Sequence, residues 1–207
     1  QKSYIINCAG SGSGATIENC EFYNNTASII AYIGNGLTDF KANNNVFKNN
    51  KGTINLEAQA NSNSLGLCFK VTSNGATFDN NTFINNTNAT HGAALCVNAE
   101  NVTISNCHME NNSARYGAAI ECHKGTMKVY NTTFIGNKAY GYSVWKKDRA
   151  GGGGAIAFIG PNNYIDNCTF INNRAENFGG AMDIHTVNNQ TAHYTTVVNS
   201  RFENNTA

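Results

Sequence analysis

Hydrophobic and polar positions recur along this chain with a period of about 25 residues. Each repeat carries an Asn, a Phe or Met three residues later, and another Asn three residues after that. The apolar members of the pattern are Phe22, Phe47, Phe83, Met109, Phe134, Phe170 and Phe202. Their spacings are 25, 36, 26, 25, 36 and 32 residues, so three repeats hold insertions. Self-similarity with a period of tens of residues predicts a stack of identical units.

The alternation of side chains within one repeat shows where the backbone bends. Ile17 and Phe22 both belong to the apolar pattern, yet they are five positions apart, whereas residues on one face of a strand are an even number apart. A corner at residues 19–20 absorbs the extra residue, and the same reasoning places a second corner at residues 24–25. Asn suits such corners because it tolerates the left-handed backbone conformation, and because its amide can bond to equivalent amides in neighbouring layers.

A third short strand follows the second corner, most clearly at residues 93–97, 118–122, 155–158 and 181–184. Its predicted inward columns are Leu95, Ile120, Ile156 and Met182, and next to them Val97, Cys122, Phe158 and Ile184. Three strands in about 25 residues leave no room for a strand–helix unit, which needs 30 or more. The sequence therefore predicts an all-β fold, a right-handed parallel β-helix of about seven coils, as a single domain over residues 1–207. The insertions lie near 57–75, 138–152 and 186–194.

Composition and charge indicate which kinds of partner the surface of the protein favours. Of the 207 residues, 41% are hydrophobic, which is enough for a core, but only 13% are charged and the net charge is +1. Such a surface lacks the clustered positive charge that nucleic acids and acidic membranes require, so we expect neither as a partner. No apolar run is long enough to span a bilayer. Neither end resembles a cap, so we expect a piece of a longer protein or a subunit that associates end to end.

The chain has seven cysteines, an odd number, and no C-x-x-C pair that would indicate a zinc site. Three of them, Cys20, Cys107 and Cys168, share one repeat position that Asn45, Asn81, Thr132 and Ser200 fill elsewhere. Free thiols serving as small residues and a disulfide between layers both fit this pattern. We expect no metal and no cofactor.

The paired signatures Gly-Gly-Ala-Ile or -Met (residues 153–156 and 179–182) and Phe-x-Asn-Asn (residues 83–86, 170–173 and 202–205) carry a resemblance to known proteins. They resemble the repeats of polymorphic outer membrane proteins and of archaeal adhesin-like surface proteins, which have the pectin-lyase-like β-helix. The resemblance covers almost the whole chain. It implies the fold, an extracellular or cell-surface location and a role in adhesion.

The insertion at 138–152 is the first candidate site. It groups Tyr140, Tyr142, Trp145, Lys146 and Arg149, and aromatic faces beside basic groups suit a sugar ring or an acidic polymer. Alternatively, Trp145 covers the flank of the helix and the basic groups are solvated. Among many Asn-x-Ser/Thr sequons, Asn88 and Asn189 lie at expected loop tips and are the glycosylation candidates.

The second candidate is an outward column next to the third strand. Cys96, Glu121, Ala157 and Asp183 are expected on the outside in successive layers, with His123 and His185 nearby. Carboxylates and imidazoles together can act as acid and base. Glu121 and Asp183, however, are expected about 9.6 Å apart, two layers of strand spacing, with Ala157 between them, so only an inverting glycosidase geometry is marginally reached.

The function that we expect is structural and adhesive rather than enzymatic. The rod would hold loops that bind a glycan or a surface protein of another cell, outside the cell that makes it, and could associate end to end into a filament. The alternative is a carbohydrate-active enzyme of the same fold, a polysaccharide lyase or an inverting glycoside hydrolase, which requires clustered carboxylates in a groove.

Overall fold

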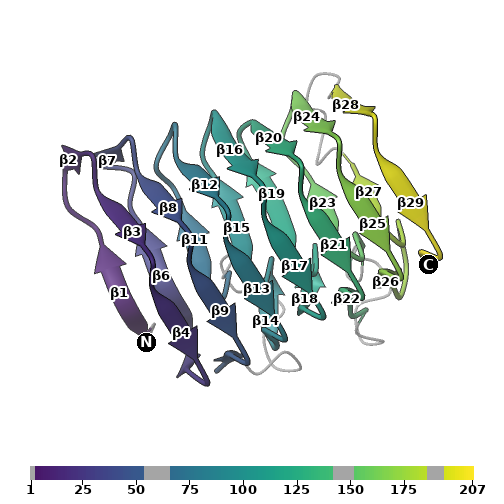
Figure 1. The fold of residues 1–207 in the computed structure, drawn as a ribbon, viewed down its shortest axis with the longest axis horizontal. Coiled ribbons are helices and arrows are strands. Elements are labelled where there is room, and N and C mark those ends of the chain that lie inside the picture. Colours follow the sequence, from purple (N-terminus) through teal and green to yellow (C-terminus); the bar gives the residue numbers. More distant parts are fainter. Residues whose placement is uncertain (1–2, 54–65, 142–151, 186–193) are drawn as a thin grey trace.

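The structure is a computed structural model that describes residues 3–53, 66–141, 152–185 and 194–207. All regular elements in these residues are β-strands, and no helix occurs among them. The strands lie side by side along one axis and point the same way within each sheet, with the two termini at opposite ends of the stack (Figure 1). The chain is a parallel β-helix, as the repeat pattern predicts.

Three seven-stranded parallel sheets form the sides of the helix, and we call them faces A, B and C. Face A consists of β1 (Tyr4–Cys8), β6 (Ile29–Ile33), β11 (Phe69–Val71), β15 (Leu95–Asn98), β19 (Ile120–Lys124), β23 (Ile156–Phe158) and β27 (Met182–Ile184). Face B consists of β3 (Thr16–Glu18), β8 (Lys41–Asn43), β12 (Thr77–Asp79), β16 (Val102–Ser105), β20 (Met127–Tyr130), β24 (Asn163–Asp166) and β28 (Thr195–Val198). Face C consists of β4 (Glu21–Tyr23), β9 (Val46–Lys48), β13 (Thr82–Ile84), β17 (His108–Glu110), β21 (Thr133–Ile135), β25 (Thr169–Ile171) and β29 (Arg201–Glu203).

The seven Phe and Met positions form one column inside face C, as predicted. Each is in register with its equivalent in the next coil, from Phe22 to Phe202. The rings of Phe134 and Phe170 stack with centroids 4.8 Å apart and planes 3° apart. The five middle members are fully buried, whereas Phe202 in the last coil is 47% exposed. These stacked side chains form the apolar column of the core beneath face C.

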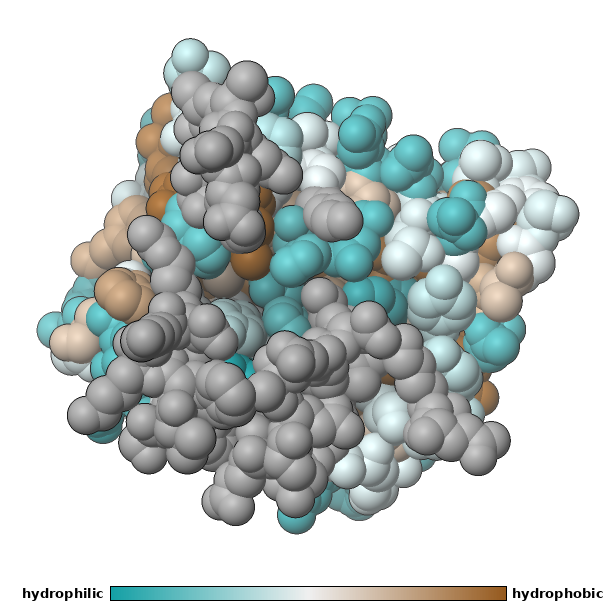
Figure 2. Space-filling view, turned by 180° about the vertical axis from the view of Figure 1, so that it is seen from behind, coloured by the Kyte–Doolittle hydropathy of each residue, from teal (hydrophilic) through white to brown (hydrophobic). Residues whose placement is uncertain are grey.

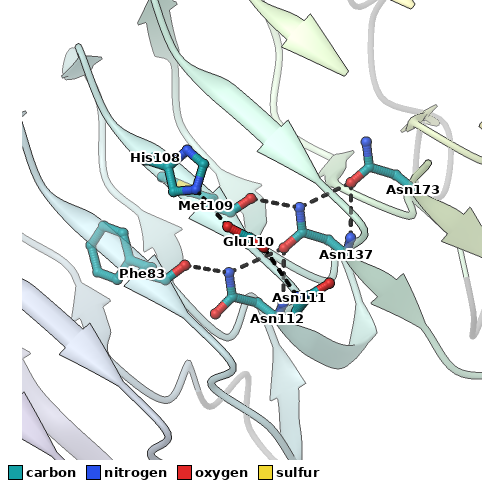
Figure 3. Close-up of polar contacts among 8 residues, drawn as sticks. All are labelled: Phe83, His108, Met109, Glu110, Asn111, Asn112, Asn137 and Asn173. Carbon is teal, nitrogen blue, oxygen red and sulfur yellow. Dashed lines mark hydrogen bonds and ion pairs between the residues drawn. The ribbon is translucent and has the colours of Figure 1, made fainter. Parts of the chain in front are cut away.

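Two-residue corners form either end of face C. The first residue of each corner has a left-handed backbone, and it is an Asn with φ between 48° and 58° at every corner except one, where it is Gly136 with φ 62°. The second Asn points inward after the Phe strand, and these residues form a ladder: Asn25, Asn50, Asn86, Asn112, Asn137, Asn173 and Asn205. Figure 3 shows the central rungs, in which each amide also bonds to a backbone carbonyl of an adjacent coil. Both predicted corners are confirmed.

The second residues of the corners that precede face C form another column, and three of the cysteines belong to it: Cys20, Cys107 and Cys168. There Asn81 Oδ1 accepts a hydrogen bond from the Asn45 backbone N–H at 3.0 Å, and the Thr132 hydroxyl accepts one from the Cys107 N–H at 3.3 Å. A thiol is small enough for this column and donates weakly to nearby backbone carbonyls. All seven cysteines are free, so thiols used as small residues are what the fold contains, rather than a disulfide between layers.

The structure adds short corner strands to the three that the sequence predicts for each coil. Between faces C and A lie a pair, β5 (Thr26–Ala27) with β10 (Lys51–Gly52), and a four-stranded sheet of β14 (Ala89–His91), β18 (Ser113–Tyr116), β22 (Lys138–Ala139) and β26 (Arg174–Ala175). Between faces A and B, β2 (Gly12–Ser13) pairs with β7 (Leu37–Thr38). The corner sheet ends at a glycine turn. At Gly117, with φ +49°, a Cβ would lie 2.1 Å from the carbonyl oxygen of Ile120.

Two of the predicted insertions can be compared with the described residues. Face A strand β11 (Phe69–Val71) lies within the range 57–75 and is in register with β6 and β15, so this part of the range belongs to the coil. In the range 138–152, residues 138–139 form β22, and Gly152 pairs with Phe178 of the next coil. The range 186–194 lies outside the described residues except for Tyr194.

Candidate functional site

The outward column predicted on face A exists in the expected register. Lys70 pairs with Cys96, Cys96 with Glu121, Glu121 with Ala157, and Ala157 with Asp183. The prediction that these residues lie on the outside was wrong as regards solvent, because Cys96 and Glu121 are fully buried and Asp183 is 8% exposed. Burial means that any charge on this column is felt strongly by its neighbours.

Glu121 is the centre of a cluster of titratable side chains. Its Oε1 atom lies 3.8 Å from His91 Nε2 and 3.7 Å from His123 Nδ1, and its Oε2 atom lies 3.8 Å from the Cys96 thiol. Oε1 accepts no hydrogen bond from the described residues although it is buried. A carboxylate in this position is held by charge and by close packing rather than by short hydrogen bonds.

Two local features of the chain bring the imidazoles to Glu121. The pairing of β15 with β19 shifts by one residue after Val97 and Cys122, and the residue left without a partner at this bulge is His123. A β-bulge re-aims the side chain that it carries. His91 ends corner strand β14 one coil earlier, directly before the turn at Gly92, and stacks on Tyr116 with ring centroids 5.0 Å apart.

The electrostatics of the cluster follow from burial. Burial lowers the pKa of His91, and nearby His123, Lys70 and Arg115 lower it further, while the Glu121 carboxylate opposes the shift. Burial also raises the pKa of the Cys96 thiol to about 12, although Lys70, whose Nζ lies 3.6 Å from the sulfur, acts in the other direction. Cys96 is therefore an uncharged thiol at neutral pH and not a nucleophile.

A second acid–imidazole pair lies at the C-terminal end of the same face. Asp183 Oδ2 and His185 Nδ1 are 3.0 Å apart, and both side chains are less than a tenth exposed. The carboxylate occupies the room that a side chain at position 152 would take, since a Cβ on Gly152 would lie 2.4 Å from Asp183 Oδ2. Ala157 separates this pair from Glu121 along the column.

A third pair, on face C, has a different environment. His108 Nε2 lies 2.9 Å from Glu110 Oε2, and Asn111 donates to the other carboxylate oxygen at 3.3 Å (Figure 3). Both partners are 36% exposed. Exposed pairs of this kind contribute little energy and are solvated, so this pair serves as a reference for the two on face A.

The chain resembles a known protein family in sequence as well as in fold. The family model described as a right-handed β-helix region matches residues 8–150. The chain belongs to the right-handed β-helix family. Searches of curated proteins and of solved structures found no match to this chain. The predicted fold, including its handedness, is confirmed, and the family is shared by adhesins and by pectin-lyase-like enzymes.

Of the five residues predicted for the loop site, Tyr140 alone lies among the described residues. Tyr140 follows β22, and Lys138 Nζ lies 4.4 Å above the centre of its ring. The same ammonium lies 3.8 Å from Glu176, which also accepts a hydrogen bond from the Gly141 N–H at 2.8 Å. The other members of this site lie outside the described residues: Tyr142, Trp145, Lys146 and Arg149. Lys138 thus contacts both the ring of Tyr140 and the Glu176 carboxylate beside the end of corner strand β22.

Of the two glycosylation candidates, Asn88 lies among the described residues and Asn189 does not. Asn88 is partly buried at the start of corner strand β14, and its side-chain amide donates to the Gly52 carbonyl at 2.6 Å. Attachment of a glycan to this β-helix at Asn88 would have to accommodate that bond, and it stays a prediction. Asn189 lies outside the described residues.

Sequence reasoning missed His91, Lys70 and Arg115 as members of the Glu121 cluster. One signal was available: His91 and Tyr116 both stand directly before a glycine of the repeat, so they share a column beside face A. In the part of the β-helix that the structure describes, no group of three or more His, Cys, Asp or Glu side chains could hold a metal ion. Nor does that part contain a helix long and apolar enough to cross a membrane.

Proposed function

We propose that this chain is a non-enzymatic segment of an extracellular or cell-surface protein, a stiff β-helix that presents a binding surface to a glycan or to a surface protein of another cell. This is the role that the resemblance to adhesin-like surface proteins implies. The observation that carries the proposal is the continuous inner ladder, in which each buried Asn bonds to the next coil through both its backbone N–H and its side-chain amide. Such a ladder suits a load-bearing rod.

The distribution of carboxylates supports the same proposal. Glu121 and Asp183 lie two strands apart on face A, with Ala157 between them, and both are buried. A pair of catalytic carboxylates has to reach a bound sugar from two sides, which requires exposure to a groove. Outside the grey residues, the middle of the side opposite to that in Figure 1 is mostly hydrophilic, whereas hydrophobic residues gather at its left edge (Figure 2); the hydrophilic part suits hydrogen bonding to a polar partner.

The second candidate function is a carbohydrate-active enzyme, a polysaccharide lyase or an inverting glycoside hydrolase. The observation that favours it is the occurrence of two acid–imidazole pairs on one face, Glu121 with His123 and Asp183 with His185. A buried carboxylate beside an imidazole is an arrangement that general acid–base catalysis uses.

One experiment separates the two. The purified chain, a Trp145→Ala variant and a Tyr23→Ala control are applied to a glycan array, and the same polysaccharides are assayed for new reducing ends and unsaturated products. Tyr23 is a suitable control because it is 43% exposed and lies on face C. We expect binding that Trp145→Ala loses and Tyr23→Ala keeps, without turnover. Equal binding by all three forms would remove the loop site, and turnover abolished by His123→Gln or His185→Gln would establish the enzyme instead.

End-to-end self-association is the remaining part of the proposal. All strands of faces A, B and C are parallel, so a further coil of the same kind could extend each sheet without a change of register. Sedimentation velocity over a hundredfold concentration range tests it. A single species of monomer mass at every concentration would exclude association of this segment.

A further inference from the structure

We propose that four exposed Asn residues along one edge of the β-helix are acceptors for N-linked glycans: Asn24, Asn85, Asn111 and Asn204. We call them the acceptor column. The group that they receive is an oligosaccharide delivered from a polyprenyl diphosphate. The proposal rests on the extracellular location in the proposed function but not on adhesion. It is carried by the register, the exposure and the hydrogen bonds of these Asn side chains.

The acceptor column follows from the repeat. Each member is the first residue of the corner after face C, and it directly follows β4, β13, β17 or β29. Residues 24–26, 85–87, 111–113 and 204–206 read Asn-Asn-Thr or Asn-Asn-Ser, which is the acceptor motif for N-glycosylation. In the other three coils Lys51, Lys138 and Arg174 occupy the position of the hydroxyl residue, and the motif is lost. The four motifs lie on the edge where the strands of face C end (Figure 1).

The two Asn residues of each motif have opposite environments. The first is exposed and has a left-handed backbone, with φ between 52° and 56° in the acceptor column. The second points inward and belongs to the inner ladder, in which Asn86 and Asn112, for example, are fully buried. N-glycosylation modifies the first residue of the motif. A glycan on the acceptor column therefore leaves the inner ladder intact.

The side-chain amides of the acceptor column are available to carry a sugar. Within the described residues, the side chains of Asn24 and Asn204 make no hydrogen bond. Asn85 Nδ2 donates to Asn49 Oδ1 at 3.2 Å, and Asn111 Nδ2 donates to the carboxylate of the preceding residue at 3.3 Å. An amide nitrogen carries two hydrogens, so each of these amides keeps one that can be replaced.

A second set of exposed motifs differs in this respect. Asn80, Asn131 and Asn167 lie at the corner before face C, and each begins such a motif. Their Nδ2 atoms donate to the Asn Oδ1 atom of the preceding coil at 2.8, 3.3 and 2.9 Å and form an outer ladder. A sugar on these amides has to fit between side chains of adjacent coils. Asn88 is more restricted still, because it is partly buried and its Nδ2 lies 2.6 Å from the Gly52 carbonyl.

The reaction is a substitution at the first sugar of the oligosaccharide. Asn Nδ2 forms a bond to C1 of this sugar, the bond between C1 and the diphosphate oxygen of the donor breaks, and one amide hydrogen leaves as a proton. An oligosaccharyltransferase of the exporting cell performs the transfer on the chain before it folds. The structure then selects among the modified chains, because close-packed coils accept only a glycan that projects into solvent.

The test secretes the full chain, fused to a secretion signal, from cultured animal cells. Folded monomer is collected by gel filtration, and peptide mass spectrometry measures the glycan occupancy of each motif. We expect every member of the acceptor column to be occupied to a greater extent than Asn80, Asn131, Asn167 and Asn88. An unmodified acceptor column, or equal occupancy of both corners, would overturn the proposal.

Two variants compare the corners within one coil. Lys51→Thr creates a motif at Asn49, after face C, and Val46→Thr creates one at Asn44, before face C. Both Asn residues are exposed, with φ 58° and 56°. The Asn44 side chain bonds to the coils on both sides, whereas the Asn49 side chain only accepts a bond within the described residues. We expect a new glycan at Asn49 and a much smaller gain at Asn44; equal gains would contradict the role assigned to the outer ladder.

A third variant and the natural protein complete the test. Ser113→Ala removes the motif of Asn111, so the glycan should be lost from Asn111 and retained at Asn24. A glycan that persists at Asn111 would show that the motif does not direct the modification. Protein taken from the surface of the cells that make it should show the same pattern of occupancy. Unmodified protein there would overturn this proposal and leave adhesion open, because the glycan array tests binding separately.

Discussion

Replacement of Asn137 by Ala tests whether the inner ladder holds the coils together. Asn137 is fully buried at the centre of the ladder. Its backbone N–H and Nδ2 donate to Asn173 Oδ1 at 3.0 and 2.9 Å, and Nδ2 also donates to the Met109 carbonyl at 2.9 Å. Its own Oδ1 accepts from the backbone N–H and Nδ2 of Asn112 at 3.0 and 3.1 Å (Figure 3).

The expected loss of stability follows from the groups that alanine leaves without partners. Asn137→Ala keeps its own backbone N–H but removes the acceptor of the Asn112 N–H, the acceptor of one Asn112 Nδ2 hydrogen, and the donor to the Met109 carbonyl. A buried polar group left unsatisfied costs about 1–3 kcal/mol, so three such groups cost at least about 3 kcal/mol. This is a large part of the 5–15 kcal/mol by which native proteins are usually stable.

Equilibrium unfolding in urea, followed by circular dichroism and by fluorescence, measures this loss as a change in the free energy of unfolding. The matched control is Asn172→Gly. Asn172 is the outer member of a corner pair, exposed and with φ 56°, and glycine keeps that backbone conformation. We expect the control to change stability by less than about 0.5 kcal/mol. A loss below about 1 kcal/mol for Asn137→Ala, with the urea slope unchanged, would refute the assignment of the ladder as a main source of stability.

Two further predictions concern the core and the turns. Phe134→Ala should lower the free energy of unfolding by about 3–5 kcal/mol. Phe202→Ala should lower it by less than half of that amount, because the Phe202 ring is 47% exposed in the last coil. Urea titrations of both variants check this, and equal losses would contradict the expectation that burial sets the contribution of each ring in the column. Gly117→Ala should cost about 1–3 kcal/mol because φ is +49° and the new Cβ would meet the Ile120 carbonyl at 2.1 Å; calorimetry should show a lower melting temperature, and an unchanged one would mean that the turn relaxes freely.

The sequence alone determined the repeat and everything that the repeat implies. In a parallel stack, equivalent residues of successive coils lie over one another, so linear spacing translates directly into neighbours in space. The column from Phe22 to Phe202, the corners at the Asn pairs and the order Cys96, Glu121, Ala157 and Asp183 on face A could all be predicted in this way, and the structure has them.

The sequence did not determine what covers a given position, and only the tertiary structure decided this. Alternation distinguishes inward from outward side chains, but an outward residue can still be buried by another part of the coil, as Glu121 is by the approach of His91 from the preceding coil. That contact is diagonal between layers. The corner strand recurs in successive coils as β14, β18, β22 and β26, but among the described face A pairings only that of β15 with β19 has the bulge that carries His123. Periodicity specifies what is common to all coils, whereas a site arises where single coils differ.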